Sequence, residues 1–228
     1  MEKKGLELLM AVLLLAGVLA LSREVVNVMS DGETVSKVIL VDPGHGGDDP
    51  GMIGIDNLKE KDINLQISLK LKTCLEEAGY QVVMTRDTDE GLYDAHASSK
   101  KAQDMQRRCE MITESAPCLS VSIHQNSYSD SAVKGPQVFY YKDSAEGERL
   151  AKALQDKLNT YLEVERPRVV KGNTSYYLLK RSKGILNIVE CGFLTNPDEA
   201  YKLTDEAYKQ KVADALCAGI REYLGEEQ

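Results

Sequence analysis

The stretch KVILVDPGHGG, Lys37–Gly47, joins a short apolar run to a histidine that stands among glycines. The β-branched and leucine residues of Val38–Val41, followed by the turn residues Pro43 and Gly44, predict a buried strand. His45 then follows the end of that strand, where open α/β sheets bind their ligands. This pattern alone leaves two interpretations open, because a histidine here could be a metal-binding or catalytic group or could simply cap a loop.

A helix and a second strand are predicted to follow. Apolar residues recur at helical spacing over Lys59–Ala78, and Gln81–Thr85 (QVVMT) has the composition of a strand. Glu60 stands in the first turn of the helix, where a carboxylate commonly does no more than interact favourably with the helix dipole. A helix that follows a strand packs antiparallel to it, so its first turn lies near the strand end. Glu60 and His45 could therefore share a site.

Two further apolar runs also stop at ionisable residues. Leu119–Ile123 is followed by His124, and Ile185–Val189 is followed by Glu190. The ends of parallel strands lie at one edge of a sheet, so the imidazoles that follow them can converge on one point. The third histidine, His96, stands in a polar segment and is predicted to be a solvated loop residue.

The remaining secondary structure is predicted from the same periodicities and from turn residues. Helices are expected over Lys100–Glu114, Glu146–Leu162 and Asp198–Leu224, strands over Gly135–Tyr141 and Tyr176–Leu179, and a loop over Arg166–Ser175.

The amino-acid composition limits the kinds of protein this chain can be. The 228 residues, 43% of them hydrophobic and 28% charged, suffice for one sizeable core and one domain. A formal net charge of −8 argues against nucleic acid as a partner, because phosphate contacts need clustered cations. The densest basic stretch contains Lys100, Lys101, Arg107 and Arg108, and acidic residues interrupt it. We therefore expect it to be a solvated helix face.

Five cysteines are scattered without CxxC or any other metal-type spacing. Most lie in or beside apolar stretches, where a free cysteine behaves as a small hydrophobic residue. No disulfide framework is therefore predicted for Cys74, Cys109, Cys118, Cys191 and Cys217.

The N-terminus has the pattern of a targeting segment. Two lysines precede the uncharged run LLMAVLLLAGVLAL, Leu8–Leu21. This run is shorter than the roughly 20 residues that span a bilayer, so residues 1–22 are predicted to be a signal peptide or, if uncleaved, a membrane anchor. The terminal position and the basic flank disfavour a buried core helix. Residues 23–36 are predicted to be a linker, and the protein is expected to be exported, either secreted or membrane-anchored.

Three strand ends and one helix start thus offer His45, Glu60, His124 and Glu190. Two histidines and one carboxylate, with a fourth position open, make the ligand set of a catalytic zinc site. A second, uncoordinated carboxylate could take a proton from water and deliver it to a leaving amine, which suits amide hydrolysis. The sequence contains no HExxH, cysteine quartet, GxGxxG, Walker A or GxSxG motif, so other zinc sites, nucleotide binding and serine acyl transfer lack support.

A set of ordered motifs carries a specific resemblance. VDPGHGG, KEKDINLQI, TRDTD, SIHQN and IVECGFLTNPDEA resemble, in this order, the zinc-dependent N-acetylmuramoyl-L-alanine amidases of bacterial cell walls. The resemblance runs from about Lys37 to Tyr223, and it implies one catalytic domain over residues 37–225. It also implies an α/β fold with a mostly parallel, mixed central sheet and helices on both faces.

The same resemblance implies functional roles. It places Zn²⁺ between His45, Glu60 and His124, with Glu190 as general base and acid, and implies cleavage of the bond between the muramic lactyl group and L-alanine. Within the family, the N-terminal hydrophobic segment and the motifs YYLLK and VECGFLTNP are most similar to the germination-specific, CwlD-type amidases of the spore cortex. That subgroup clears stem peptides so that a deacetylase can form muramic-δ-lactam.

The expected partners are the peptidoglycan substrate, the membrane through the N-terminal segment, and an accessory protein needed for activity or targeting. The last is expected because the sequence contains no wall-binding repeat or basic tail. Two alternatives stay open. One is a non-catalytic or partner-dependent peptidoglycan-binding or regulatory relative, although no predicted ligand is lost. The other is a zinc carboxypeptidase or deacetylase, whose first two ligands typically lie much closer in sequence than His45 and Glu60.

Overall fold

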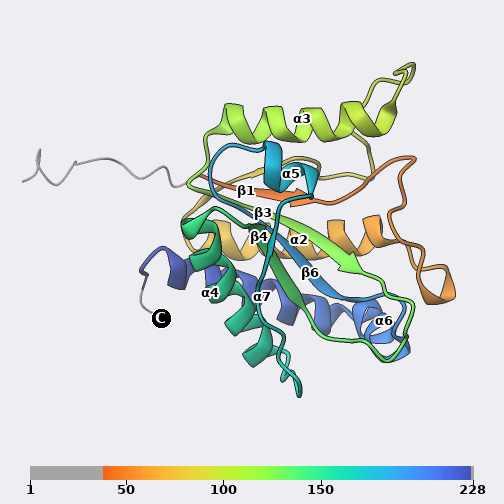
Figure 1. Ribbon diagram of the computed structural model, residues 1–228, viewed down its shortest axis with the longest axis vertical. Coiled ribbons are helices and arrows are strands. Elements are labelled where there is room, and N and C mark those ends of the chain that lie inside the picture. Colours follow the sequence, from red (N-terminus) through yellow and green to blue (C-terminus); the bar gives the residue numbers. More distant parts are fainter. Residues whose placement is uncertain (1–37, 227–228) are drawn as a thin grey trace, which may run out of the picture. The chain divides into compact units, whose positions relative to one another are not determined.

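The computed structural model describes residues 38–226, so the predicted targeting segment and linker lie outside the described residues. Strands and helices mostly alternate along the chain, with β3 followed directly by β4 and α6 by α7 (Figure 1). The elements are β1 (Val38–Pro43), η1 (Ile55–Asn57), α2 (Glu60–Glu77), β2 (Gln81–Met84), α3 (Lys100–Ser115), β3 (Leu119–Asn126), β4 (Gln137–Tyr141), α4 (Ala145–Tyr161), β5 (Lys171–Asn173), α5 (Tyr177–Arg181), β6 (Leu186–Phe193), α6 (Pro197–Thr204) and α7 (Glu206–Tyr223).

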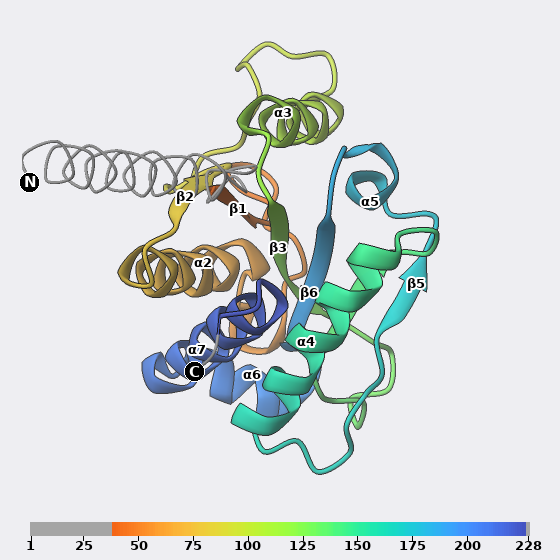
Figure 2. The same cartoon turned by 90° about the vertical axis from the view of Figure 1, so that its left-hand side faces the viewer.

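The described strands form one six-stranded sheet in the order β2-β1-β3-β6-β4-β5. The four strands from β2 to β6 run parallel, β4 pairs antiparallel with β6, and β5 is parallel to β4. This is a mostly parallel, mixed sheet. Parallel strands need covered faces, and helices supply that cover on both sides. Figure 2 shows α2, α4 and α7 on one side of the sheet and α3 and α5 on the other. The predicted fold class is confirmed.

The two faces of the sheet carry two separate hydrophobic cores, and β1 contributes to both. Ile39 and Val41 pack into the larger core with α2, α4 and α7. Leu40, between them, points to the opposite face and packs into the smaller core with Ile112 of α3 and Leu178 of α5. Alternation along a strand sends successive side chains to opposite faces, so a continuously apolar strand is what a sheet covered on both sides requires.

Three predicted elements differ in the structure. Tyr176–Leu179, predicted as a strand, lies at the start of the short helix α5, because a short apolar run can be buried equally well in either conformation. The predicted loop Arg166–Ser175 contains β5, which adds an edge strand beside β4. The long C-terminal helix is two helices, since the Asp205 side chain accepts from the Tyr208 amide and caps the second.

A disulfide joins Cys74 of α2 to Cys217 of α7, so the prediction of no disulfide was wrong for this pair. The two cysteines lie 143 residues apart in sequence. They meet because α2 and α7 pack side by side on one face of the sheet, a contact that the spacing of cysteines does not encode. Cys109, Cys118 and Cys191 are free.

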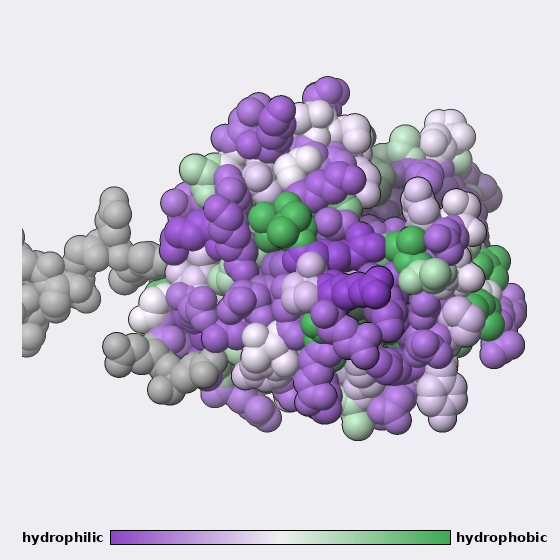
Figure 3. Space-filling model, turned by 60° about the horizontal axis from the view of Figure 1, so that its bottom comes forward, coloured by the Kyte–Doolittle hydropathy of each residue, from purple (hydrophilic) through white to green (hydrophobic). Residues whose placement is uncertain are grey.

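On the face drawn in Figure 3, hydrophilic residues predominate and hydrophobic residues appear only in small separate groups. No helix within residues 38–226 has the length and apolar character needed to cross a bilayer.

Candidate metal centre

The loop after β1 places His45 by an unusual backbone turn. His45 has φ of 63°, in the left-handed region that residues other than glycine seldom adopt, and Gly46 and Gly47 that follow also have positive φ. Two buried arginines hold this turn. Arg86 donates to the Gly44 carbonyl over 3.0 Å, and Arg108 donates to the His45 carbonyl over 2.7 Å. The surrounding structure therefore fixes the direction of the His45 ring.

Glu60, the first residue of α2, lies between the two histidines. Its Oε2 is 3.2 Å from His45 Nε2, and its Oε1 is 2.9 Å from His124 Nδ1. The backbone amides of Met52 and Gln125 donate to the same carboxylate over 2.8 and 3.1 Å. Glu60 is 4% exposed, so these contacts fix both of its oxygens in place. Antiparallel packing of α2 against β1 thus brings its first turn to the strand end.

His124 reaches the same point from β3. His124 was predicted to follow the end of the strand. The strand instead continues to Asn126, with a register shift after His124, so this histidine lies within it. The two imidazoles meet edge to face, with their centroids 5.0 Å apart. Gly44 makes this approach possible, because an added Cβ there would lie 2.2 Å from His124 Cε1. Gly51 does the same for the other pair, since its Cβ would lie 2.6 Å from both Glu60 Oε2 and His45 Cδ2.

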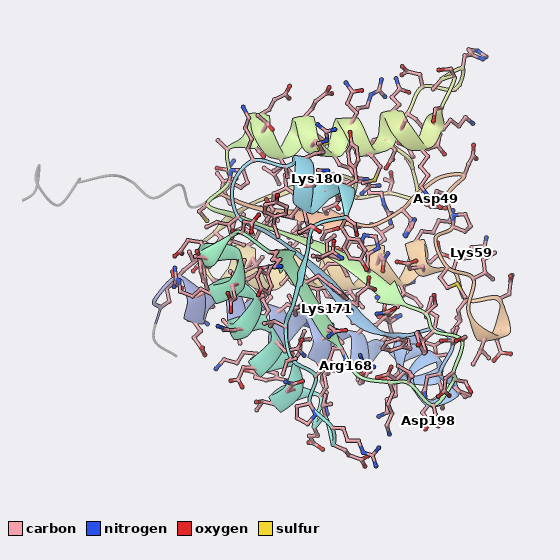
Figure 4. All side chains as sticks on the ribbon, in the orientation of Figure 1. Asp49, Lys59, Arg168, Lys171, Lys180 and Asp198 are labelled. Carbon is pink, nitrogen blue, oxygen red and sulfur yellow. A yellow bond between two sulfur atoms is a disulfide. The ribbon has the colours of Figure 1, made fainter. Side chains whose placement is uncertain are left out.

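These three side chains fit the requirements of a divalent metal. His45, Glu60 and His124 each offer one ligand atom, and these atoms all lie within 4.8 Å of one another. Two imidazoles and a carboxylate are a common donor set for Zn²⁺. The other ring nitrogen of His45, Nδ1, lies 2.9 Å from Asp49 Oδ2. A carboxylate at that position fixes the tautomer and the ring of a metal-binding histidine. Figure 4 shows Asp49 on the loop that follows β1.

Close contact between charges shifts the pKa values of this group. Burial alone would raise the pKa of Glu60, but the two histidines hold it well below its usual value. Burial alone would lower the pKa of His45, but hydrogen bonds and charge from Glu60 and Asp49 raise it to about 9. The cluster therefore stabilises positive charge beside Glu60, as a cation site must.

Glu190 stands next to the histidines on β6. It pairs in register with His124, so both side chains leave neighbouring parallel strands at the same level. Loss of solvation, with a smaller effect from Glu60, raises the pKa of Glu190 to about 7. Its Oε2 atom is buried and has no hydrogen-bond partner among the described residues. A carboxyl group in this state can exchange a proton near neutral pH.

All four predicted site residues line one cleft of 330 Å³. Side chains from β1, α2, β3, α3, α5 and β6 surround it. His96 is exposed and lies outside this cleft. The strand-end pattern in the sequence thus located the cleft, although β3 and β6 continue beyond the residues at which they were expected to end.

Sequence reasoning missed the buried cluster that supports the site. Arg108 was predicted to lie on a solvated helix face, but it is 1% exposed. It contacts the buried Asp42 and donates to Asp104 and to the carbonyls of Pro43 and His45. Asp42 also accepts from Thr85 and Ser122. The available signal was Asp42 itself, a charged residue within an otherwise apolar strand, which requires a buried partner.

Comparisons with known proteins all point to the same enzyme family. A family model described as N-acetylmuramoyl-L-alanine amidase matches residues 39–222. The germination-specific N-acetylmuramoyl-L-alanine amidase of Bacillus subtilis (strain 168) is 38% identical over 194 residues, which cover 84% of this chain and 81% of that protein. The amidase LytC of the same strain is 33% identical over 206 residues, which cover 90% of this chain but 38% of the relative.

A solved structure gives the same indication. The CwlD amidase from Clostridioides difficile, in complex with the GerS lipoprotein, superposes with a TM-score of 0.80 at 38% sequence identity. The match covers 83% of this chain and 99% of that one.

Proposed function

This chain belongs to the N-acetylmuramoyl-L-alanine amidase family, and we propose that Zn²⁺ held by His45, Glu60 and His124 is the cofactor of this amidase. The substrate is the amide bond between the lactyl group of N-acetylmuramic acid and L-alanine of peptidoglycan. Bound Zn²⁺ at such a site polarises a carbonyl group and lowers the pKa of water.

In this proposal Glu190 moves the protons. Its carboxylate takes a proton from the attacking water and delivers it to the amine of L-alanine as the carbon–nitrogen bond breaks. A pKa raised to about 7 suits both steps, since the group must give up the proton as readily as it accepts it. The single observation that carries this role is the buried, unsatisfied Oε2 of Glu190 beside the three ligand candidates.

The chemistry is tested by mass spectrometry of purified peptidoglycan after incubation with the zinc-loaded protein. We expect stem peptides with a free N-terminal alanine, and uncut sugar chains. The Glu190→Gln protein, loaded with the same amount of zinc, is the matched control and should release almost none. Intact glycopeptides after incubation with the zinc-loaded wild-type protein would contradict the proposal.

We also infer a role in maturation of the spore cortex and an accessory protein that assists targeting to its substrate. The support is the similarity to a germination-specific amidase and to CwlD, which was solved in complex with a lipoprotein. Removal of stem peptides is the step that precedes muramic-δ-lactam formation in such a cortex. Deletion of the gene should leave cortex muramic acid carrying its peptides and lacking the lactam. Normal lactam content in the deletion strain would exclude this role.

We propose that the protein acts outside the cytoplasm, as its substrate requires. Residues 1–22 would direct export as a signal peptide or anchor, residues 23–36 would serve as a linker, and residues 37–225 would carry the catalysis. N-terminal sequencing of the protein recovered from cells distinguishes cleavage from anchoring. Recovery of the chain only from the cytoplasm would contradict export.

A further inference from the structure

The catalytic cleft continues on both sides of the candidate metal centre. On one side lie α3 and the start of α5, which we call the cationic arm. Its lining residues on α3 and at the start of α5 are Lys101, Asp104, Met105, Arg108, Tyr176, Tyr177 and Leu178. On the other side a groove of 720 Å³ adjoins the cleft and shares Met52 and Ser127 with it. We call this groove the hydroxyl arm, and it is lined by Met52, Ile53, Gly54, Ile55, Ser127, Tyr128, Ser129, Ser131, Leu194 and Thr195.

The hydroxyl arm has no charged residue in its lining. Hydroxyl groups of three serines, a threonine and a tyrosine alternate there with apolar side chains. Ile53 and Tyr128 stand out from it, 49% and 59% exposed. A sugar presents many hydroxyl groups and also apolar C–H surfaces, so hydroxyl side chains and an exposed aromatic ring complement it. This arm therefore suits a neutral carbohydrate.

The cationic arm carries an ammonium group that is available to a ligand. Lys101 is exposed at the cleft, and its charge acts on Asp49 without a direct ion pair to that or another described residue. The acids near it are already paired, since Asp104 accepts from Arg108 over 2.6 Å and Asp49 contacts His45 over 2.9 Å. The neighbouring Lys100, by contrast, is paired with Asp48. Lys101 is thus the charged side chain in this arm that can take an anionic group.

Glu190 points toward the same arm. Ile188, two residues earlier on β6 and therefore on the same face of the sheet, packs into the core with Leu178 of α5. Tyr176 and Leu178 line the cleft together with Glu190. Figure 2 shows α5 beside β6 on the side of the sheet that α3 also covers. A group protonated by Glu190 would consequently leave toward α3 and α5.

The chemistry of the substrate distinguishes its two halves. The amine of L-alanine is the leaving group, and the peptide runs from it to a C-terminal carboxylate. The lactyl group on the other side is uncharged, because its carboxyl is consumed in the amide. One half is therefore an anionic peptide that leaves with the amine, and the other half is a neutral sugar.

We propose that peptidoglycan lies across the cleft in one direction, with the stem peptide in the cationic arm near Lys101 and the muramic sugar chain in the hydroxyl arm. This orientation rests on the proposed amidase function. It assigns Lys101 to recognition of the peptide carboxylate and Tyr128 to packing against sugar.

The peptide half is tested with paired substrates, N-acetylmuramoyl-L-alanyl peptides that end in a free carboxylate or in a carboxamide. The zinc-loaded wild-type protein should prefer the carboxylate through a lower KM, by about two- to fivefold for one exposed ion pair. Lys101→Gln should abolish that preference by raising KM for the carboxylate to the value for the carboxamide. Lys211→Gln removes another exposed charge, on α7 and outside both arms, and should retain the preference.

The sugar half is tested with glycopeptides that carry one or several sugar residues. Tyr128→Ala should raise KM for the longer glycan and leave KM for the single muramic acid nearly unchanged. Tyr201→Ala, which removes a 78% exposed tyrosine of α6 outside both arms, is the matched control and should not alter either value.

Binding gives a second measurement that does not depend on turnover. In the Glu190→Gln background, Lys101→Gln should weaken binding of the carboxylate substrate but not of the carboxamide. Added salt should reduce the difference in affinity between the two substrates when Lys101 is present. The proposed orientation would be overturned if Lys101→Gln weakened binding of the carboxylate and carboxamide substrates equally. It would also be overturned if the effect of Tyr128→Ala on KM depended on the length of the peptide and not on that of the glycan. Failure of the amidase function gives a different result, in which the wild-type protein cuts none of these substrates.

Discussion

Two buried charged clusters lie side by side at the end of β1, and they differ in how far their polar atoms are satisfied. In the support cluster, Asp42 accepts from Thr85, Ser122 and Arg108, and Arg108 reaches Asp104 as well as two backbone carbonyls. In the site cluster, formed by His45, Glu60, His124 and Glu190, the buried Oε2 of Glu190 has no hydrogen-bond partner among the described residues. A buried polar atom without a protein partner calls for an explanation, and for a carboxyl group in a cleft a catalytic role is one.

The comparison distinguishes a structural cluster from a cluster suited to catalysis. The support cluster is satisfied by protein groups and holds the carbonyl of His45, so it fixes the position of a ligand candidate. The site cluster has donor atoms directed at one another and a carboxyl group whose pKa lies near 7. Substitutions in the support cluster should therefore lower stability, and substitutions in the site cluster should lower turnover.

The largest effect is expected from His124→Ala in the site cluster. Loss of one of three ligands should abolish zinc binding and with it hydrolysis, because the two remaining donors cannot complete the site. Zinc content of the purified protein, measured by atomic emission, checks this. Undiminished zinc in the variant would remove His124 from the ligand set.

Glu190→Gln should lower kcat/KM by about 10²- to 10⁴-fold, the range that general acid–base groups supply. Zinc content should stay at the wild-type level, since Glu190 is not a ligand in this account. Glu77→Gln, an exposed position at the end of α2, is the control and should behave as wild type. Turnover near the wild-type rate in Glu190→Gln would refute the assignment.

Arg108→Met tests the support cluster. It strands the buried carboxylate of Asp42, and breaking a buried ion pair in this way costs roughly 3–5 kcal/mol of unfolding free energy. Urea denaturation at neutral pH measures the loss, and Arg107→Met on α3, which breaks only the more exposed pair with Asp94, is the control. Adding Asp42→Asn should recover part of the stability, because the stranded charge is removed. An unchanged midpoint in Arg108→Met would show that the cluster does not support the fold.

The disulfide lies in a third region that neither cluster contacts. Cys74→Ser should lower the free energy of unfolding by about 2–4 kcal/mol while zinc content and kcat stay unchanged. Peptide mapping without reductant should first identify the Cys74–Cys217 pair in the wild-type protein. Equal stability of the oxidised and reduced wild-type protein would exclude a stabilising role for this bond.

The smallest effect is expected from pH, and it should differ between the clusters. The raised pKa of Glu190 means that kcat/KM should increase as pH rises through about 7, because the protonated carboxyl cannot act as a base. The pKa of Asp42 is lowered: burial opposes the shift, but Arg108, Ser122 and Thr85 outweigh it. Its contribution to stability is therefore present above about 3.8, the unfolded value, and is lost as pH falls through the lower folded value. Rate profiles and urea midpoints measured over the same pH range compare the two.

Sequence patterns predicted the site cluster better than the support cluster. Strand ends in a parallel sheet meet at one edge, so His45 and His124 could be placed together from local patterns alone. Arg108 could not, because in the sequence it is one of several cations on a helix. Its burial arises only when α3 packs over the carbonyls of Pro43 and His45. The disulfide between Cys74 and Cys217 likewise depends on a contact between α2 and α7, which are far apart in sequence. The apolar run of α5 is too short to show a helical or strand periodicity, so its conformation depends on packing.

The most direct measurement compares wild-type and Glu190→Gln proteins, each carrying the same amount of zinc, on one preparation of peptidoglycan. The account predicts free stem peptides beginning with alanine in the wild-type digest and almost none with the variant, at equal zinc content. Equal release by the two proteins would contradict the central claim, because the group with the unsatisfied carboxyl oxygen would then have no part in breaking the bond.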